Sequence, residues 1–133
     1  MIYKKLLEFQ KLGITIKKGE INPHFKNTYA NLNEVLDKIT KPLNDLGILV
    51  IQRPEGDAHG YGLITELIDT EDDTKMQSFT PFVNATDMQK LGGAITYAKR
   101  YSLVAMLALE DEDDDGNTAS VKPPATDIPT IRR

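Results

Sequence analysis

The sequence contains no cysteine and only two histidines, and these shortages exclude several kinds of chemistry. Without cysteine there is no disulfide framework, no thiol nucleophile and no cysteine-based zinc site. His24 and His59 lie in expected loops, and neither has a spaced partner that would complete a metal site or a catalytic triad. No apolar run is long enough to span a bilayer, and the N-terminus has no signal-peptide pattern, so we expect a cytoplasmic protein without membrane contact.

Acidic and basic side chains balance over most of the chain. The formal net charge is −4, but residues 1–109 carry equal numbers of acidic and basic side chains, so the acidic excess lies in 110–133. The first 26 residues contain six lysines against two glutamates. A neutral body with local basic zones is compatible with nucleic-acid binding, although the acidic pI argues mildly against it.

The spacing of apolar residues predicts a single α+β domain. Helical periodicity predicts N-terminal helices over 2–12 and 32–46, and a long helix over 87–109. Three runs between them are typical of strands: 48–53, 60–69 and 75–83. Because their connectors are rich in turn residues, we expect a three-stranded antiparallel β-meander followed by the long helix, a βββα order.

Local signals predict where these elements begin, end or bend. Two capping pairs are expected at helix starts: Asn31 with Glu34, and Thr86 with Gln89. Pro42 is expected to kink or split its helix near Thr40, because proline lacks the N–H that a helix interior uses. Pro81 fits the end of an edge strand better than the middle of a central one.

The long helix carries the strongest functional signal. One face is apolar and is expected to pack on the sheet: Met88, Leu91, Ile95, Ala98, Ala105, Met106 and Leu109. A second face collects cations, aromatics and a glycine: Lys90, Gly93, Tyr97, Arg100 and Tyr101. Lys99 lies apart, on the far flank of the apolar stripe. Because glycine weakens a helix, Gly92 and Gly93 indicate close approach of another backbone or a ligand.

Cations and aromatic rings on one face are typical of single-strand binding, where cations follow phosphates and rings stack on bases. The pattern alone favours the simpler alternative, in which the tyrosines pack in the core or between subunits and Lys90 and Arg100 are solvated. The residues by themselves therefore favour a structural role for this face over DNA binding.

No catalytic or metal site is expected. Asp111, Asp113, Asp115 and Gly116 match the first half of a calcium loop, but Lys122 stands where that loop requires a glutamate. A two-metal nuclease needs carboxylates from separate elements, and one acidic run does not supply them. This run opposes the helix macrodipole, so the long helix is expected to end near Leu109. The GYG at 60–62 is too short and wrongly placed for a phosphate loop.

Two longer stretches resemble the Erf (essential recombination function) family of phages and prophages. NPHFKNTYANLNEVLDKITKPLNDLGILVIQ, residues 22–52, resembles the family's N-terminal signature. LGGAITYAKRYSLVAMLALEDEDDDG, residues 91–116, resembles its second signature, a glycine–alanine–isoleucine–threonine–tyrosine helix with a basic pair and an acidic end. The resemblance implies an annealing domain over 1–116, with 117–133 as a flexible tail rich in proline and threonine.

The resemblance implies ATP-independent annealing of single-stranded DNA in phage recombination, on a βββα core shared with the Rad fifty-two annealing proteins. It implies no enzyme activity and no cofactor, with a divalent cation only as a modulator of annealing. The implied partners are single-stranded DNA, further copies of the chain in a ring or helical filament, and a phage exonuclease or host single-strand-binding protein. The signatures point to these DNA-binding residues, with Lys90 added from the helix face: Lys26, Tyr29, Tyr97, Lys99, Arg100 and Tyr101.

Two alternatives remain at this point. A single-strand-binding protective protein would bind equally well without speeding the pairing of complementary strands. A metal-dependent nuclease is supported only by the acidic run.

Overall fold

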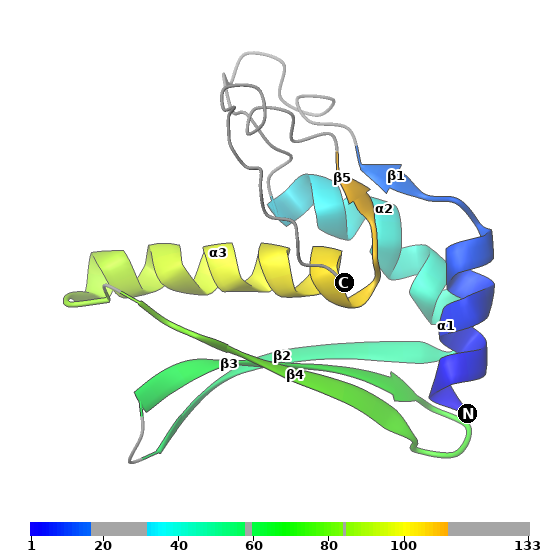
Figure 1. The fold of residues 1–133 in the computed structure, drawn as a ribbon, viewed down its shortest axis with the longest axis horizontal. Helices are drawn as coiled ribbons and strands as arrows, with labels where there is room; N and C mark the ends of the chain where they lie inside the picture. Colours follow the sequence, from blue (N-terminus) through cyan, green and yellow to red (C-terminus); the bar gives the residue numbers. More distant parts are fainter. Residues whose placement is uncertain (17–31, 58–59, 84, 112–133) are drawn as a thin grey trace, which may run out of the picture.

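A three-stranded antiparallel sheet and a long helix that lies across one of its faces organise the chain (Figure 1). The computed structural model describes residues 1–16, 32–57, 60–83 and 85–111. The elements in chain order are α1 (Ile2–Lys11), β1 (Thr15–Ile16), α2 (Leu32–Asp45), β2 (Ile48–Asp57), β3 (Gly60–Asp69), β4 (Lys75–Pro81), α3 (Met88–Met106) and β5 (Glu110–Asp111). The predicted α+β class, the meander and the following helix are confirmed.

The sheet has the order β2-β3-β4, so β3 is central and the other two strands form its edges. Strands β2 and β3 pair from Ile48 opposite Asp69 to Asp57 opposite Gly60. The prediction that β2 ends at residue 53 is wrong, because the hairpin continues into the stretch expected to be a turn. An edge strand tolerates Pro54, since its missing N–H leaves no partner strand unpaired. Pro81 ends the other edge strand, as predicted.

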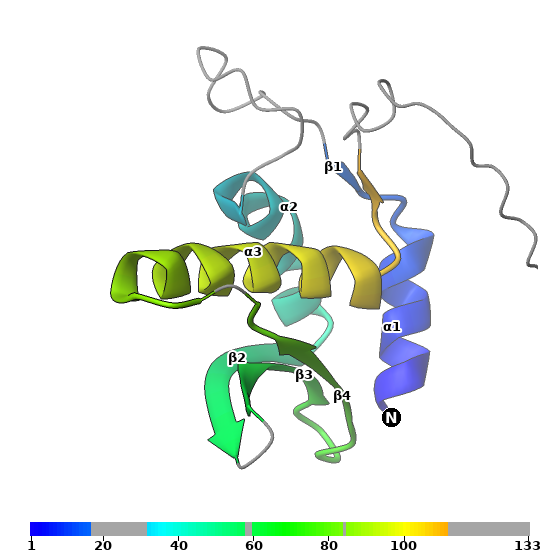
Figure 2. The same cartoon turned by 60° about the vertical axis from the view of Figure 1, so that its left-hand side comes forward.

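The core lies where α1, α2, the C-terminal part of α3 and the sheet meet. Its buried apolar side chains come from all of these elements: Ile2, Phe9, Ile16, Val35, Ile39, Leu43, Ile48, Leu67, Leu103 and Leu107. Figures 1 and 2 show α1 standing at one end of the sheet, while the N-terminal part of α3 extends toward the β2–β3 hairpin at the other end. The two ends of α3 therefore have different surroundings.

Several predicted boundaries need correction. Pro42 does not split α2, which is one helix from Leu32 to Asp45 with the fully buried Ile39 and Leu43 on either side of the proline. Asn31, the expected cap of α2, lies outside the described residues. Helix α3 is capped by Asp87, whose carboxylate accepts the backbone N–H of Lys90 at 2.8 Å, so the predicted Thr86–Gln89 box is wrong.

The end of α3 also differs from the prediction. The helix stops at Met106, and Ala108 turns the chain with a positive φ of 53°. This turn directs β5 to pair in parallel with β1, with Thr15 opposite Glu110. Strands of two residues carry no readable period, so the sequence could not predict this long-range pairing.

The expected apolar face of α3 is only partly correct. Ala98 is buried, but Met88 is 80% exposed and Ala105 is also exposed, while Arg100 and Leu103 are buried instead. The C-terminal half of α3 packs against the sheet on one side and α2 on another, so more than one face is buried there. The N-terminal half has no α2 beside it and leaves its first apolar residue in solvent.

Candidate nucleic-acid interface

A groove separates the end of β4 from the N-terminal half of α3. We call it the β4–α3 groove; its volume is about 510 Å³. Its walls include Thr80, Pro81 and Val83 from β4 and the following segment, and Lys90, Gly93 and Tyr97 from α3. Three residues of the predicted cation-and-aromatic face thus border one cavity. Their spacing of three and four residues places them on one side of the helix.

Lys90 and Tyr97 supply the chemistry of this groove. Lys90 is exposed and forms no ion pair with any residue that the structure describes. Tyr97 is 58% exposed, unusually open for a large aromatic side chain. One ammonium group and one accessible ring at a groove wall are what a phosphate and a base need, respectively.

The Tyr97 ring contacts the ring of Tyr101, which in turn contacts Arg100. Its centroid lies 4.2 Å from that of Tyr101, with the ring planes inclined by 41°. The Arg100 guanidinium carbon lies 4.6 Å from the Tyr101 centroid, which is cation–π geometry. The resulting Arg100–Tyr101–Tyr97 stack runs from a buried cation, 3% exposed, to an accessible ring.

Arg100 therefore differs from the solvated or phosphate-binding cation that the helix pattern suggested. Its position on α3 faces the packed interior, because the C-terminal half of this helix is enclosed on several sides. Burial leaves its guanidinium little surface for a phosphate, and its visible role is to support Tyr101. Direct DNA contact by Arg100 and Tyr101 stays a prediction.

Lys99 lies on the other flank of α3, as the helical wheel predicted. Its side chain is half-buried and forms no ion pair with a described residue. Its carbonyl oxygen accepts the side-chain amide of Gln52 on β2 at 3.1 Å. The same amide lies 3.0 Å from Thr65 Oγ1, which is 2.9 Å from Ser102 Oγ. This buried polar network fixes the rotation of α3 on the sheet and so determines which flank each cation occupies.

Gly92 and Gly93 have open space where a β-carbon would stand. No described part of the chain approaches them, so the close approach that the sequence suggested does not occur within the described chain. Contact with another molecule at this surface stays a prediction. Lys26 and Tyr29, the candidates from the first signature, lie outside the described residues.

A second groove, missed from the sequence, borders the opposite flank of α3. We call it the hairpin–α3 groove; it measures about 430 Å³. Pro54 and Tyr61 of the β2–β3 hairpin, Phe82 and Ala85 of the segment before α3, and Leu91 and Ile95 of the helix line it. Phe82 borders both grooves. The GYG at 60–62 was the one sequence signal at this position.

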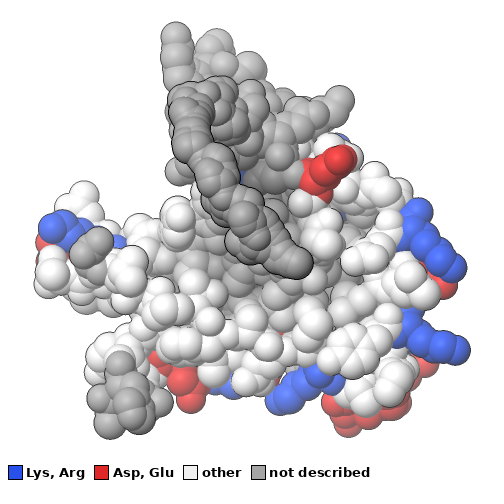
Figure 3. Space-filling view, in the orientation of Figure 1, with Lys and Arg blue, Asp and Glu red and all other residues white. Residues whose placement is uncertain are grey.

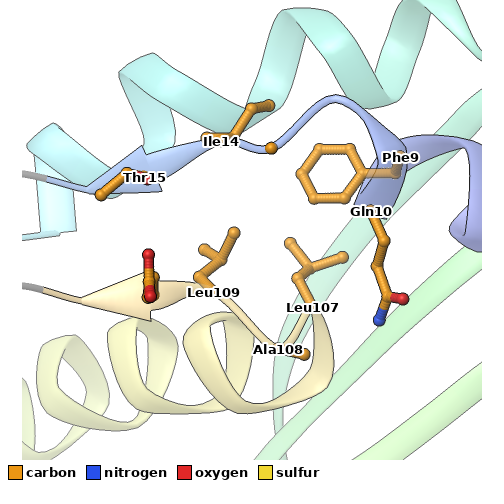
Figure 4. Close-up of a pocket in the computed structure, with 9 residues that line it drawn as sticks. Phe9, Gln10, Ile14, Thr15, Leu107, Ala108 and Leu109 are labelled. Atoms are coloured by element: carbon orange, nitrogen blue, oxygen red, sulfur yellow. The ribbon is translucent and has the colours of Figure 1, made fainter.

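A third groove, of about 410 Å³, lies at the other end of the fold, between α1 and the turn into β5 (Figure 4). Phe9, Leu107 and Leu109 extend into the space between these two segments. None of the predicted DNA-binding residues that the structure describes, all of them on α3, lines it. We therefore assign it to the packing of the β1–β5 pair.

Charge is not concentrated on the face seen in Figure 3, where basic and acidic side chains of the described residues alternate around the rim. Several described lysines form ion pairs with acidic neighbours, such as Lys41 with Asp45 and Lys75 with Glu66. The tightest cluster surrounds Asp69, far from both α3 grooves. There the Lys5 ammonium at 2.7 Å and the Met1 amino group at 2.8 Å hold the pKa of the buried Asp69 carboxyl well below its usual range.

The described part of the chain contains neither a metal-binding cluster nor a membrane-spanning helix. No group of three or more histidine, aspartate or glutamate side chains there could hold a metal ion, while most of the acidic run lies beyond residue 111. Among the described helices, none has the length and apolarity to cross a membrane.

The architecture is that of an α+β domain with two grooves beside α3, one bordered by Lys90 and Tyr97 and the other by aromatic and apolar side chains. A family model described as the ERF superfamily matches residues 2–129, so the chain belongs to that superfamily. This confirms the family that the two signatures resemble, a family of recombination proteins associated with DNA binding. No curated protein and no solved structure matches the chain.

Proposed function

We propose that this protein binds single-stranded DNA and pairs complementary strands without ATP during homologous recombination of a phage or prophage. Membership of the ERF superfamily over residues 2–129 is the observation that carries the proposal. The β4–α3 groove supports it, because Lys90 and the accessible ring of Tyr97 offer one phosphate contact and one stacking surface.

The kind of contact also suits annealing. A protein that pairs strands must bind any sequence and leave base edges available to the complement. Phosphate contacts and stacking are tolerant of sequence, whereas hydrogen bonds to base edges would compete with pairing. The described groove residues offer a cation, aromatic rings and apolar side chains, which suits the tolerant mode.

We further propose that the working form is a homo-oligomer, a ring or a helical filament, in the cytoplasm of the bacterial host. One chain offers only a few basic side chains on any one face, so a long strand needs the grooves of several subunits in line. The edges of β2 and β4 and the exposed glycine surface of α3 are surfaces that another copy can approach. The proposed domain covers residues 1–116 and needs no cofactor. Its proposed protein partner is an exonuclease or a host single-strand-binding protein.

The proposal is tested by mixing two complementary oligonucleotides, labelled as a fluorescence-transfer pair, with the protein in the absence of ATP. We expect faster pairing with the protein than without it, in the presence or absence of magnesium. Binding without faster pairing would identify a protective binding protein instead. Magnesium-dependent shortening of the strands would identify a nuclease.

A further inference from the structure

The GYG at 60–62 forms the start of β3. Gly60 adopts a positive φ of 134° at the hairpin turn, and Tyr61 is the next residue. The Tyr61 side chain is 71% exposed, more open than Tyr97, and it lines the hairpin–α3 groove. An aromatic ring this exposed gains little free energy from burial in the isolated chain, whereas a ligand that covers it would remove apolar surface from water.

Tyr61 is exposed but its ring is constrained. Gly56 lies directly opposite it on β2, and a β-carbon at Gly56 would overlap the ring of Tyr61. The ring therefore lies against the glycine backbone, a close approach that only glycine permits. A ring that is already positioned loses little rotamer freedom when a flat ligand stacks on it.

The surroundings of Tyr61 suit an uncharged flat group. Leu91 and Ile95 of α3 stand across the groove, and among the described residues that line it no side chain is charged. Lys99 lies one helical turn beyond Ile95 and forms no ion pair with a described residue, so a cation stands near the groove without entering it. Phe82 borders both grooves, so the β4–α3 groove lies on the other side of this side chain.

We infer that Tyr61 forms a second base-stacking site, in which the hairpin–α3 groove takes a nucleobase of single-stranded DNA. The inference rests on the proposed function and adds a contact that neither family signature contains. Each subunit then holds bases on both flanks of α3, at Tyr97 and at Tyr61, with Phe82 between them.

Phe79 provides a matched control. It is 54% exposed, and a β-carbon at Gly62 would overlap its ring, so it is also an exposed ring resting on a glycine. However, Phe79 alternates along β4 with Ser78 and Thr80, which face α3, so its ring lies on the opposite face of the sheet. Tyr61 and Phe79 therefore differ mainly in which face they occupy.

The experiment compares Tyr61→Leu, Tyr61→Phe and Phe79→Leu in the full chain. Two labelled probes of equal length are used in anisotropy titrations: an oligothymidylate and the same backbone with abasic positions. Tyr61→Leu is expected to weaken oligothymidylate binding by roughly 5-fold to 150-fold, the range for one lost stacked base. It should also narrow the affinity gap between the two probes. Tyr61→Phe and Phe79→Leu are expected to keep both affinities, and all three variants to keep the melting temperature.

Gly56→Ala tests the same site without removing the ring, since the added methyl group displaces Tyr61. It is expected to reproduce the loss seen with Tyr61→Leu. Equal affinities for Tyr61→Leu and Phe79→Leu would overturn the inference, while normal binding by the unmodified protein would leave the proposed function intact. A change of oligomer size with Tyr61→Leu, with the probe gap unchanged, would assign the groove to a second copy of the chain. Failure of the unmodified protein to bind either probe would instead reject the proposed function.

Discussion

The two halves of α3 have opposite surroundings, although they belong to one continuous helix. The C-terminal half lies between the sheet and α2, and it buries Leu103, Ser102 and even the Arg100 guanidinium. The N-terminal half extends past α2 (Figure 2). It exposes Met88 and Tyr97 and has a groove on each flank. One half thus holds the fold together and the other presents a surface. Substitutions should separate stability from binding along the helix.

The largest expected effect is on stability, at Leu103. This side chain is fully buried in the shared core, so Leu103→Ala should lower the free energy of unfolding by about 2–5 kcal/mol. Met88→Ala, at the exposed end of the same helix, should change it by less than about 0.5 kcal/mol. Urea denaturation followed by circular dichroism measures both. Equal losses would mean that the two halves do not differ as described.

Asp69 should contribute to stability and not to binding, because its ion pairs lie at the end of the molecule far from both α3 grooves. Its folded pKa is held below its ordinary value of 3.8 by Lys5 and Met1, so its stabilising effect is complete above the unfolded pKa. This effect is lost as the pH falls below about 4 toward the folded pKa. Asp69→Asn should be less stable than the unmodified chain at pH 7, with the difference shrinking below pH 4. Melting temperatures between pH 7 and pH 2 check this, and a constant difference would contradict it.

Tyr97 should affect binding and not stability. Because its ring is largely exposed, Tyr97→Ala should weaken single-strand binding by roughly 1–3 kcal/mol per stacked base. The melting temperature should be unchanged. Tyr101→Leu should weaken binding less than Tyr97→Ala does, since it leaves the stacking ring in place but removes its support. A drop in melting temperature for Tyr97→Ala would show a packing role instead.

The lysines on the two flanks of α3 should contribute to DNA binding in a way that depends on salt concentration. Lys90→Ala and Lys99→Ala should each weaken binding to all sequences alike, and each should flatten the slope of log K against log salt by roughly 0.7. Arg100→Ala should instead lower stability, because its guanidinium is buried against Tyr101. Titrations at several salt concentrations, paired with melting curves, distinguish the two outcomes.

Lys26 is predicted to behave as Lys90 does. If neither Lys90 nor Lys99 alters the slope, the phosphates contact other residues, with the lysines of 4–26 as the next candidates.

The smallest expected effect concerns Gly93. Since a β-carbon there meets open space, Gly93→Ala should stabilise the isolated fold by up to about 1 kcal/mol through helix propensity. If another subunit or DNA approaches this surface closely, the same change should weaken assembly or binding, and Gly93→Val should weaken it more. Light scattering and anisotropy measure the two effects. Unchanged assembly and binding in both variants would remove Gly93 from the interface.

Sequence periodicity was sufficient for the meander, for α1 and for the flanks of α3 on which Lys90 and Lys99 lie. It did not predict how deeply individual side chains are buried. Arg100 and Tyr97 share a helical face, yet the first is buried and the second is exposed, a difference that helical spacing does not predict. The same limit explains Met88, which is apolar and correctly spaced yet has no partner at the exposed end of the helix. The hairpin–α3 groove was also missed, because Tyr61 meets Leu91 only through the tertiary fold.

The sequence by itself determined the order of the elements, the family and the residue types on each flank of α3, since these depend on local spacing and on motifs. The tertiary structure alone decided which half of α3 is enclosed, how Tyr101 and Arg100 support Tyr97, and why Tyr61 rests on Gly56. The physical reason is that burial and ring contacts depend on residues distant in the chain. The spacing of residues within a helix carries no information on how far the neighbouring elements extend along that helix.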